Sequence, residues 1–374
     1  MKIFKCLSRI SVILSAVLVL SPVQAAEKED PFAGFSRTKK VINSKKTDPA
    51  PVRPSITDAD VESNIKNKDL ANDQILITAT ALIEKNRSRE AAEFLWARVD
   101  KLNIDGLSVL GEIALKNNNS GDLKKIASVI IGKFPTAAEG PHYEGHAFIL
   151  THELPKASQK FLTAIENNKK FKPAYVGLAQ TYFLRKNPLE ERVVYQDMIS
   201  IFGKEIDTLT RLCELNVRDG QNDQAIDFCK QAMALDPKIP ENFVSYALVF
   251  KNQGDLEKFG KELKKVSEKF KQSELAQFEY GIYLNEKNDF AAAQPIFENC
   301  ISIDPKSVRC LIGLTTSSVG TQKWESAYEA LKKACRFGRK YSVEVRKALQ
   351  VARTAKAKEW IVKLEELASN CVSQ

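Results

Sequence analysis

Small residues recur at a fixed step of 34 along most of this 374-residue chain. Seven of them follow one another at that step: Gly111, Gly145, Ala179, Cys213, Ala247, Gly281 and Thr315. Seven uncharged residues keep the same phase nineteen positions later: Ile130, Ala164, Met198, Ala232, Val266, Cys300 and Ala334. An unbroken period indicates one supersecondary unit repeated in tandem, so the chain is predicted to form a stack of similar units.

Each unit is predicted to be a pair of helices joined by a short polar turn. In residues 274–307 the turn is 285–289, where Asn and Asp end one helix and cap the next. Small residues at positions eight and twenty of the unit let the two helix axes approach closely, and larger apolar residues fill the layer between units. Proline at position thirty-two stops the second helix, because it lacks an amide donor. The fold class is therefore all-α.

This pattern resembles the tetratricopeptide repeat (TPR) family. Residues 274–307 carry it best, with Tyr280 and Gly281 at positions seven and eight, Ala293 at twenty, Phe297 at twenty-four and Pro305 at thirty-two. The resemblance implies a right-handed α-solenoid of helix–turn–helix repeats. Seven units in register cover residues 104–341, and a looser pair covers 70–103. We expect an array of about eight repeats over residues 70–341, followed by capping helices over 342–374.

The resemblance also implies where a partner binds. In the TPR family the first helices line a concave groove, at positions two, five, nine, twelve and thirteen. Carried onto this chain, the predicted groove residues are His142, His146, Ile149, Val176, Gln180, Phe183, Thr210, Glu214, Val244, Leu248, Phe278 and Ile282. Phe183, Leu248, Phe278 and Ile282 are expected to form an apolar strip suited to a peptide or a helix.

The segment before the array, residues 1–69, differs from it in composition. Residues 1–26 have a positive start, a short apolar stretch and small residues near Ala25, which is typical of a secretory signal peptide. This predicts an exported, periplasmic protein; an uncleaved signal that anchors the chain in the inner membrane is the alternative. Residues 27–69 are polar with few bulky apolar side chains, and are expected to be a disordered leader.

Charge is concentrated at the end of the chain. The net charge is +9, and residues 332–363 hold eleven Lys or Arg against few acids. A basic end suits an anionic surface, such as lipid headgroups or an envelope polymer. Nucleic acid is not an expected partner, because the chain is predicted to be exported and has no binding motif with interleaved aromatic residues.

Six cysteines follow the predicted signal peptide, and an even number in an exported chain favours disulfides. Their places in the repeat suggest the pairs Cys300–Cys310, Cys213–Cys229 and Cys335–Cys371. The alternative is that they pack as small apolar core residues.

No enzyme motif is present, and no cofactor is expected. The three histidines are His142, His146 and His152; the first two lie four apart and share a helix face, with Glu139 or Glu153 as a further metal ligand. That spacing is weak evidence, and we predict no metal site. The sequence therefore predicts a non-enzymatic scaffold or adaptor of the bacterial envelope that binds a protein or peptide in its groove. Binding of an anionic envelope polymer or membrane surface through the basic end is the alternative; the oligomeric state and the partner's identity stay open.

Overall fold

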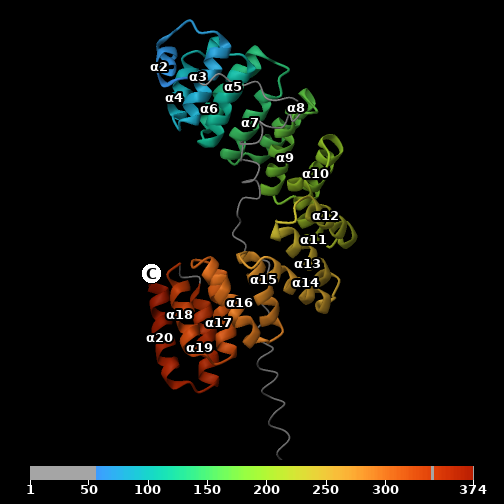
Figure 1. Cartoon of the computed structure of the whole chain (residues 1–374), viewed down its shortest axis with the longest axis vertical. Coiled ribbons are helices and arrows are strands. Elements are labelled where there is room, and N and C mark those ends of the chain that lie inside the picture. Colours follow the sequence, from blue (N-terminus) through green and yellow to red (C-terminus); the bar gives the residue numbers. More distant parts are fainter. Residues whose placement is uncertain (1–55, 338–340, 374) are drawn as a thin grey trace, which may run out of the picture. The chain divides into compact units, whose positions relative to one another are not determined.

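The computed structural model describes residues 56–337 and 341–373, in which the chain forms nineteen α-helices, one short 3₁₀ helix and no strand (Figure 1). The predicted signal peptide, residues 1–26, and the leader up to residue 55 lie outside the described residues. No described helix is long and apolar enough to cross a membrane. The all-α helical repeat fold predicted from the period is confirmed.

The helices form consecutive pairs. The first helices of the pairs are α3 (Asn72–Glu84), α5 (Ile104–Lys116), α7 (Glu139–Leu150), α9 (Lys172–Leu184), α11 (Ile206–Arg218), α13 (Pro240–Asn252), α15 (Glu274–Glu286), α17 (Val308–Gly320) and α19 (Ser342–Thr354). The second helices are α4 (Ser88–Trp96), α6 (Ser120–Lys133), α8 (Leu154–Asn167), α10 (Pro188–Phe202), α12 (Asn222–Leu235), α14 (Leu256–Lys269), α16 (Phe290–Ile303), α18 (Trp324–Cys335) and α20 (Lys358–Ser373). From α6 to α20, every second helix begins one full period after the previous one.

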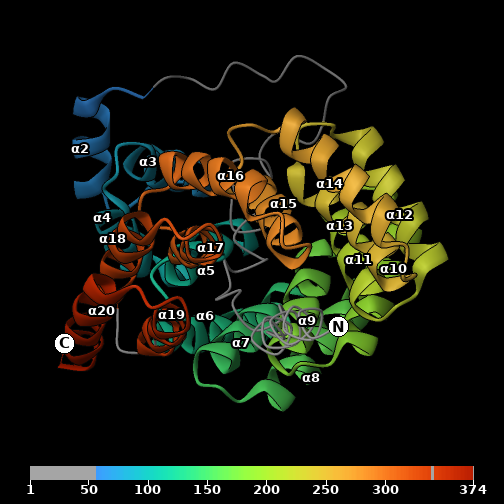
Figure 2. The same cartoon turned by 90° about the horizontal axis from the view of Figure 1, so that it is seen from below.

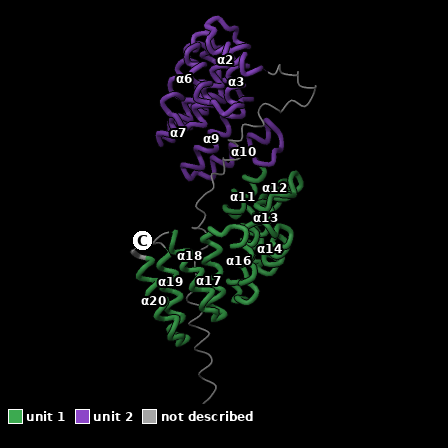
Figure 3. The backbone as a smooth tube through the Cα atoms, turned by 60° about the vertical axis from the view of Figure 1, so that its left-hand side comes forward, with its two compact units in different colours: residues 1–29, 209–374 green, residues 30–208 purple. Residues whose placement is uncertain are grey.

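The described chain divides into two compact units (Figure 3). Unit 2 contains α2 (Asp58–Lys66), the 3₁₀ helix η2 (Val99–Lys101) and the pairs from α3 to α10. Unit 1 contains the pairs from α11 to α20. Within each unit most second helices contact the first helix of the next pair, so the pairs stack in chain order.

The same turn joins the two helices of every pair. One residue of each turn has a positive φ, and these residues recur with the repeat: Asn86, Asn118, His152, Lys186, Gly220, Gly254, Asn288, Gln322 and Lys356. The residue that follows donates its amide to the carbonyl five positions earlier, as in Glu153 N to Phe148 O at 2.9 Å. This left-handed C-cap satisfies the last carbonyls of the first helix. His152, one of the three histidines, therefore serves as a turn residue.

Aromatic rings at position twenty-four pack against glycines on both sides. Phe297 lies between Gly281 of its own pair and Gly313 of the next pair, and Phe161 lies in the same way between Gly145 and Gly177. A Cβ at Gly281 would lie 2.7 Å from the Phe297 ring, and a Cβ at Gly313 would overlap it. Both phenylalanines are fully buried. The small residues of the period thus make room for the ring that joins consecutive pairs.

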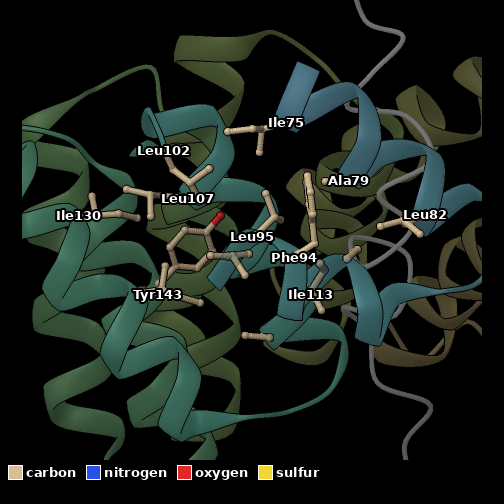
Figure 4. Packing of buried hydrophobic residues seen from close by; sticks show 14 of the residues in the cluster. Ile75, Ala79, Leu82, Phe94, Leu95, Leu102, Leu107, Ile113, Ile130 and Tyr143 are labelled. Carbon is tan, nitrogen blue, oxygen red and sulfur yellow. The ribbon is translucent and has the colours of Figure 1, made fainter. Parts of the chain in front are cut away.

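The core of unit 2 begins at its first helices (Figure 4). Ile75, Leu82 and Leu95 come from α3 and α4, and they are fully buried with Leu107 of α5. Tyr143 of α7 completes this cluster, and its hydroxyl donates a hydrogen bond of 3.0 Å to the Ser108 carbonyl. One continuous apolar layer therefore connects α3, α4, α5 and α7.

The predicted end of the leader at residue 69 is wrong. Helix α2 lies within that segment, and Val61 is fully buried in the unit 2 core. Thr57 and Asp60 form a capping box: the Asp60 amide donates to the Thr57 hydroxyl at 3.2 Å, and the Thr57 amide donates to the Asp60 carboxylate at 3.1 Å. Val61 and Ile65, which lie four apart on one helix face, give a polar segment enough apolar surface to pack.

The helices expected to cap the array keep its spacing. Helices α19 and α20 begin one period after α17 and α18, and they lie beside α18 in unit 1 (Figures 1 and 2). Leu349 and Ile361 occupy the two positions that hold small residues in earlier pairs. Because these positions carry bulky residues, the period of small residues does not extend to the last pair.

Three disulfides lie within unit 1. They join the pairs suggested by the repeat, with Cα–Cα distances of 4.8 Å for Cys213–Cys229, 6.0 Å for Cys300–Cys310 and 5.3 Å for Cys335–Cys371. Cys213–Cys229 links the two helices of one pair, and Cys300–Cys310 links one pair to the next. Cys335–Cys371 holds α20 against α18.

Candidate functional site

The twelve predicted groove residues fall on both units. Ten of them keep partial exposure to solvent: His146, Ile149, Val176, Gln180, Phe183, Thr210, Glu214, Leu248, Phe278 and Ile282. His142 and Val244 are each only 4% exposed. Two of the twelve predicted residues therefore belong to the core rather than to a groove. Each of the other ten lies at the boundary between the core and solvent.

His142 packs among aromatic rings in unit 2. Its ring lies 5.8 Å from Phe161 and 5.3 Å from Phe171, measured between ring centroids, and both contacts are edge-on. Its Nδ1 atom is buried with no hydrogen-bond partner in the described structure. The placement of His142 in the groove is therefore wrong, because the neighbouring second helix α8 and the loop at Phe171 cover it.

The two neighbouring histidines are held neutral. Burial lowers the pKa of His142 well below its ordinary value, and the nearby His146 lowers it further. Burial lowers the pKa of His146 to about 4. The rings are 4.7 Å apart, yet no third His, Cys, Asp or Glu of the described residues lies close enough to complete a metal site with them. The pair is part of an aromatic cluster rather than a coordination sphere.

Val244 belongs to the unit 1 core. It packs with Val266 and Ala276, from the second helix of its own pair and the first helix of the next. Its prediction as a groove residue is therefore wrong, because the following pair covers position five at this repeat. One helical turn later, Leu248 keeps partial exposure while it contacts the same core.

A row of partly exposed apolar residues crosses three consecutive first helices of unit 1. We call it the first-helix strip, and it consists of Leu248 on α13, Phe278 and Ile282 on α15, and Ile312 on α17. Helix α15 contacts both α13 and α17 (Figure 2). Each of the four side chains packs against a buried cluster on one side. The strip is thus an apolar surface whose side chains are held in place by packing against the core.

Charged side chains surround this strip. At one end, Lys251 of α13 lies 3.3 Å from the Glu286 carboxylate of α15. At the other end, Arg309 of α17 forms an ion pair with Glu274 of α15, and its guanidinium lies 4.8 Å from the centroid of the Phe278 ring. An arginine over an aromatic face is favourable, and Phe278 keeps partial exposure to solvent beside it.

Glu274 also lies beside the Cys300–Cys310 disulfide. The Cys310 sulfur is 3.2 Å from the Glu274 carboxylate, and the Ser307 hydroxyl and Arg309 bind the same carboxylate. Among the described residues, Glu274, Cys300 and Cys310 place three potential metal-ligand atoms within 4.8 Å of one another. The two sulfurs are bonded to each other and the carboxylate is bound to a cation, so this arrangement does not fit a metal.

Two charged residues at this site were missed from the sequence. Arg309 occupies position two of its repeat, which is a groove position in the resembled family. Glu279 occupies position six of its repeat, on α15, and the pattern of apolar and small residues carries no signal for it. Charged residues on a repeat surface are common, and only the structure shows which of them converge.

No family model matches this sequence, and no curated protein matches it. Solved structures resemble it at low identity. The APC/C hetero-tetramer Cut9–Hcn1 has 12% identity and a TM-score of 0.44, over 84% of this chain and 58% of the matched chain. A tetratricopeptide repeat protein from Parabacteroides merdae has 12% identity and a TM-score of 0.46, over 66% of this chain and 98% of that one. YrrB, a TPR protein with an unusual peptide-binding site, has 18% identity and a TM-score of 0.39, over 50% of this chain and 95% of that one. At these TM-scores the similarities carry no weight for function, and this chain spans little more than half of the chain matched in the Cut9–Hcn1 complex.

Proposed function

We propose that this protein is a non-enzymatic scaffold that binds a protein or peptide on the first-helix strip of unit 1. The observation that carries the proposal is the strip itself, a row of apolar side chains on three consecutive first helices that keeps partial exposure. A solvated helix face has little reason to present Leu248, Phe278, Ile282 and Ile312 side by side. The helix pairs behind the strip hold it rigid, which lowers the entropic cost of binding.

The test is a pull-down from an envelope extract with the purified chain and two variants. Phe278→Asp places a charge on the strip, and we expect it to release the partner at high and low salt alike. Leu256→Asp is the control, because Leu256 is 45% exposed on the second helix α14. Retention of the same protein by Phe278→Asp would contradict the proposal. A large fall in the melting temperature of this variant would show instead that Phe278 is core.

A second candidate function rests on the basic end of unit 1. Four basic residues there lie within ion-pair distance of a carboxylate: Lys332, Lys347, Arg353 and Lys363. Five further basic residues have no such partner among the described residues, and all five are exposed: Lys333, Arg336, Arg346, Lys356 and Lys358. Binding of vesicles with anionic headgroups that weakens steeply with ionic strength would support this function.

We further propose that the chain is exported and acts in a bacterial envelope. The apolar stretch and small residues within residues 1–26 support export, as do the three disulfides, which persist in oxidising compartments. Amino-terminal sequencing of the protein from native cells tests this proposal. A chain that begins near Ala26 is expected, and one that keeps Met1 in a cytoplasmic fraction would overturn it.

A further inference from the structure

One carboxylate beside the first-helix strip has no ion-pair partner among the residues that the structure describes. No described residue reaches the Glu279 side chain with a hydrogen bond or an ion pair, although Lys251 and Arg309 are its electrostatic neighbours. Each of those cations is already bound elsewhere, Lys251 to Glu286 and Arg309 to Glu274. Glu279 thus sits among paired charges while itself unpaired.

The charges around Glu279 do not balance. Among the described residues, its charged neighbours are Lys251, Arg309, Glu286 and Glu274. Together with Glu279 itself they comprise two cations and three carboxylates, which leaves one negative charge. A carboxylate that is largely desolvated and unpaired costs stability, and a site tolerates such a group where a ligand supplies the missing charge.

The position of Glu279 puts this charge beside the strip. Helix α15 carries Glu279 between Glu274 and Glu286 in the chain, and these two carboxylates pair with Arg309 of α17 and Lys251 of α13. Ile282 lies three positions after Glu279 on α15, where side chains share a face. A side chain seated on Ile282 is therefore within reach of Glu279.

We propose that the strip selects a protein segment that places a basic side chain, lysine or arginine, next to apolar side chains, with Glu279 receiving the basic group. This inference rests on the proposed function and names the chemistry of its partner. The apolar residues of the segment cover Leu248, Phe278 and Ile282, and its cation completes the charge balance. Glu279 then determines specificity, while the apolar contact supplies most of the affinity.

The titration of Glu279 is consistent with this role. Burial raises its pKa, and Glu286 and Glu274 raise it further against the opposing effect of Arg309 and Lys251. A bound cation favours the charged carboxylate, so binding of the segment should weaken as the pH falls through the raised pKa of the free protein. An uncharged apolar segment would bind with no such dependence.

The experiment is selection from a random-peptide display library against the folded chain with its disulfides intact. We expect the enriched peptides to carry a lysine or arginine beside apolar residues. A synthetic copy of an enriched peptide should bind Glu279→Gln at least about tenfold more weakly than the unchanged protein. Glu262→Gln is the matched control, because that carboxylate pairs with Lys265 on the second helix α14. Selection on Glu279→Lys should enrich acidic residues in place of basic ones.

The outcomes separate this inference from the function on which it rests. Peptides without basic enrichment that bind Glu279→Gln normally but fail to bind Phe278→Asp would overturn the role of Glu279 and leave the strip as a binding surface. Peptides that also bind Phe278→Asp normally, or no enrichment at all, would overturn both. Circular dichroism checks that Glu279→Gln keeps the fold. If Glu279→Gln is misfolded, the test becomes the peptide preference of Glu279→Lys: enrichment of acidic residues supports the role of Glu279, and its absence contradicts it.

Discussion

At the scale of single residues, the array depends on contacts where a glycine meets a ring. The period of small residues could be seen in the sequence, but its reason could not: Gly281 and Gly313 both border Phe297, and they belong to different pairs. A glycine at position six of one repeat therefore acts together with a glycine at position eight of the previous one. The sequence pattern of a single repeat does not show this relation, because the two glycines lie on different helices and each contacts the same ring on a third helix.

This predicts the effect of a single methyl group. Gly313→Ala should lower the free energy of unfolding by about 1–3 kcal/mol, because its Cβ overlaps the rigid Phe297 ring and forces the two pairs apart. Gly132→Ala is the control: nothing lies within 4 Å of a Cβ there, and alanine should add up to about 1 kcal/mol of helix stability. Denaturant unfolding of both variants measures the difference, and equal midpoints would count against the glycine contact.

The lowered pKa of His146 predicts a pH dependence of unit 2. The folded pKa of His146 is about 4 and its ordinary value is 6.5, so the unfolded chain binds more protons between these values. The stability of unit 2 is then complete above about pH 6.5 and falls as the pH drops towards 4, by about 2 kcal/mol for this residue at about pH 5. Thermal unfolding of the wild type and of His146→Gln at two pH values measures it. The variant should lose the contribution of His146 and keep that of His142, whose pKa is also lowered by burial. An unchanged dependence would show that His146 does not contribute.

At the scale of helices, the sequence predicted most of the fold. The starts of seven first helices follow from the period, since small and apolar positions are fixed by packing between neighbours. Three features were hidden. The left-handed turn residue varies among Asn, Gly, His, Lys and Gln, helix α2 has only two apolar residues on its packed face, and the last pair carries bulky residues at the small positions. Each of these depends on a neighbour in space rather than on the repeat.

Removal of the disulfide at the last helix is expected to lower stability locally. Cys335–Cys371, with a sequence separation of 36, closes a long loop and holds α20 against α18. In the double variant Cys335→Ser, Cys371→Ser the pair α19–α20 should lose about 3–4 kcal/mol of stability, because the unfolded end regains the freedom that the loop removed. Hydrogen exchange of α20 amides should then be on the order of a hundredfold faster. The equivalent double variant at Cys213 and Cys229 should leave α20 unchanged, and an α20 unaffected by its own disulfide would contradict the prediction.

At the scale of the whole molecule, the sequence predicted a surface but not its chemistry. Ten of the twelve predicted groove positions keep partial exposure, since family-derived positions depend on the geometry of a helix pair. Val244 and His142 are buried because the neighbouring elements at these repeats cover them. The charge pattern at Glu279 arises from three helices in three repeats, and no spacing along the chain encodes it. The proposed binding chemistry thus depends on charged residues from different repeats that only the fold brings together.

The most direct measurement is photo-crosslinking in cells that make the protein, with a benzoylphenylalanine placed at Ile282 or at Leu256. Ile282 lies on the first-helix strip, and Leu256 is exposed on a second helix. We expect a discrete protein adduct from position 282 that disappears when Phe278→Asp is added, and none from position 256. Adducts from position 256 alone, or adducts from 282 that survive Phe278→Asp, would contradict the claim that this face binds the partner.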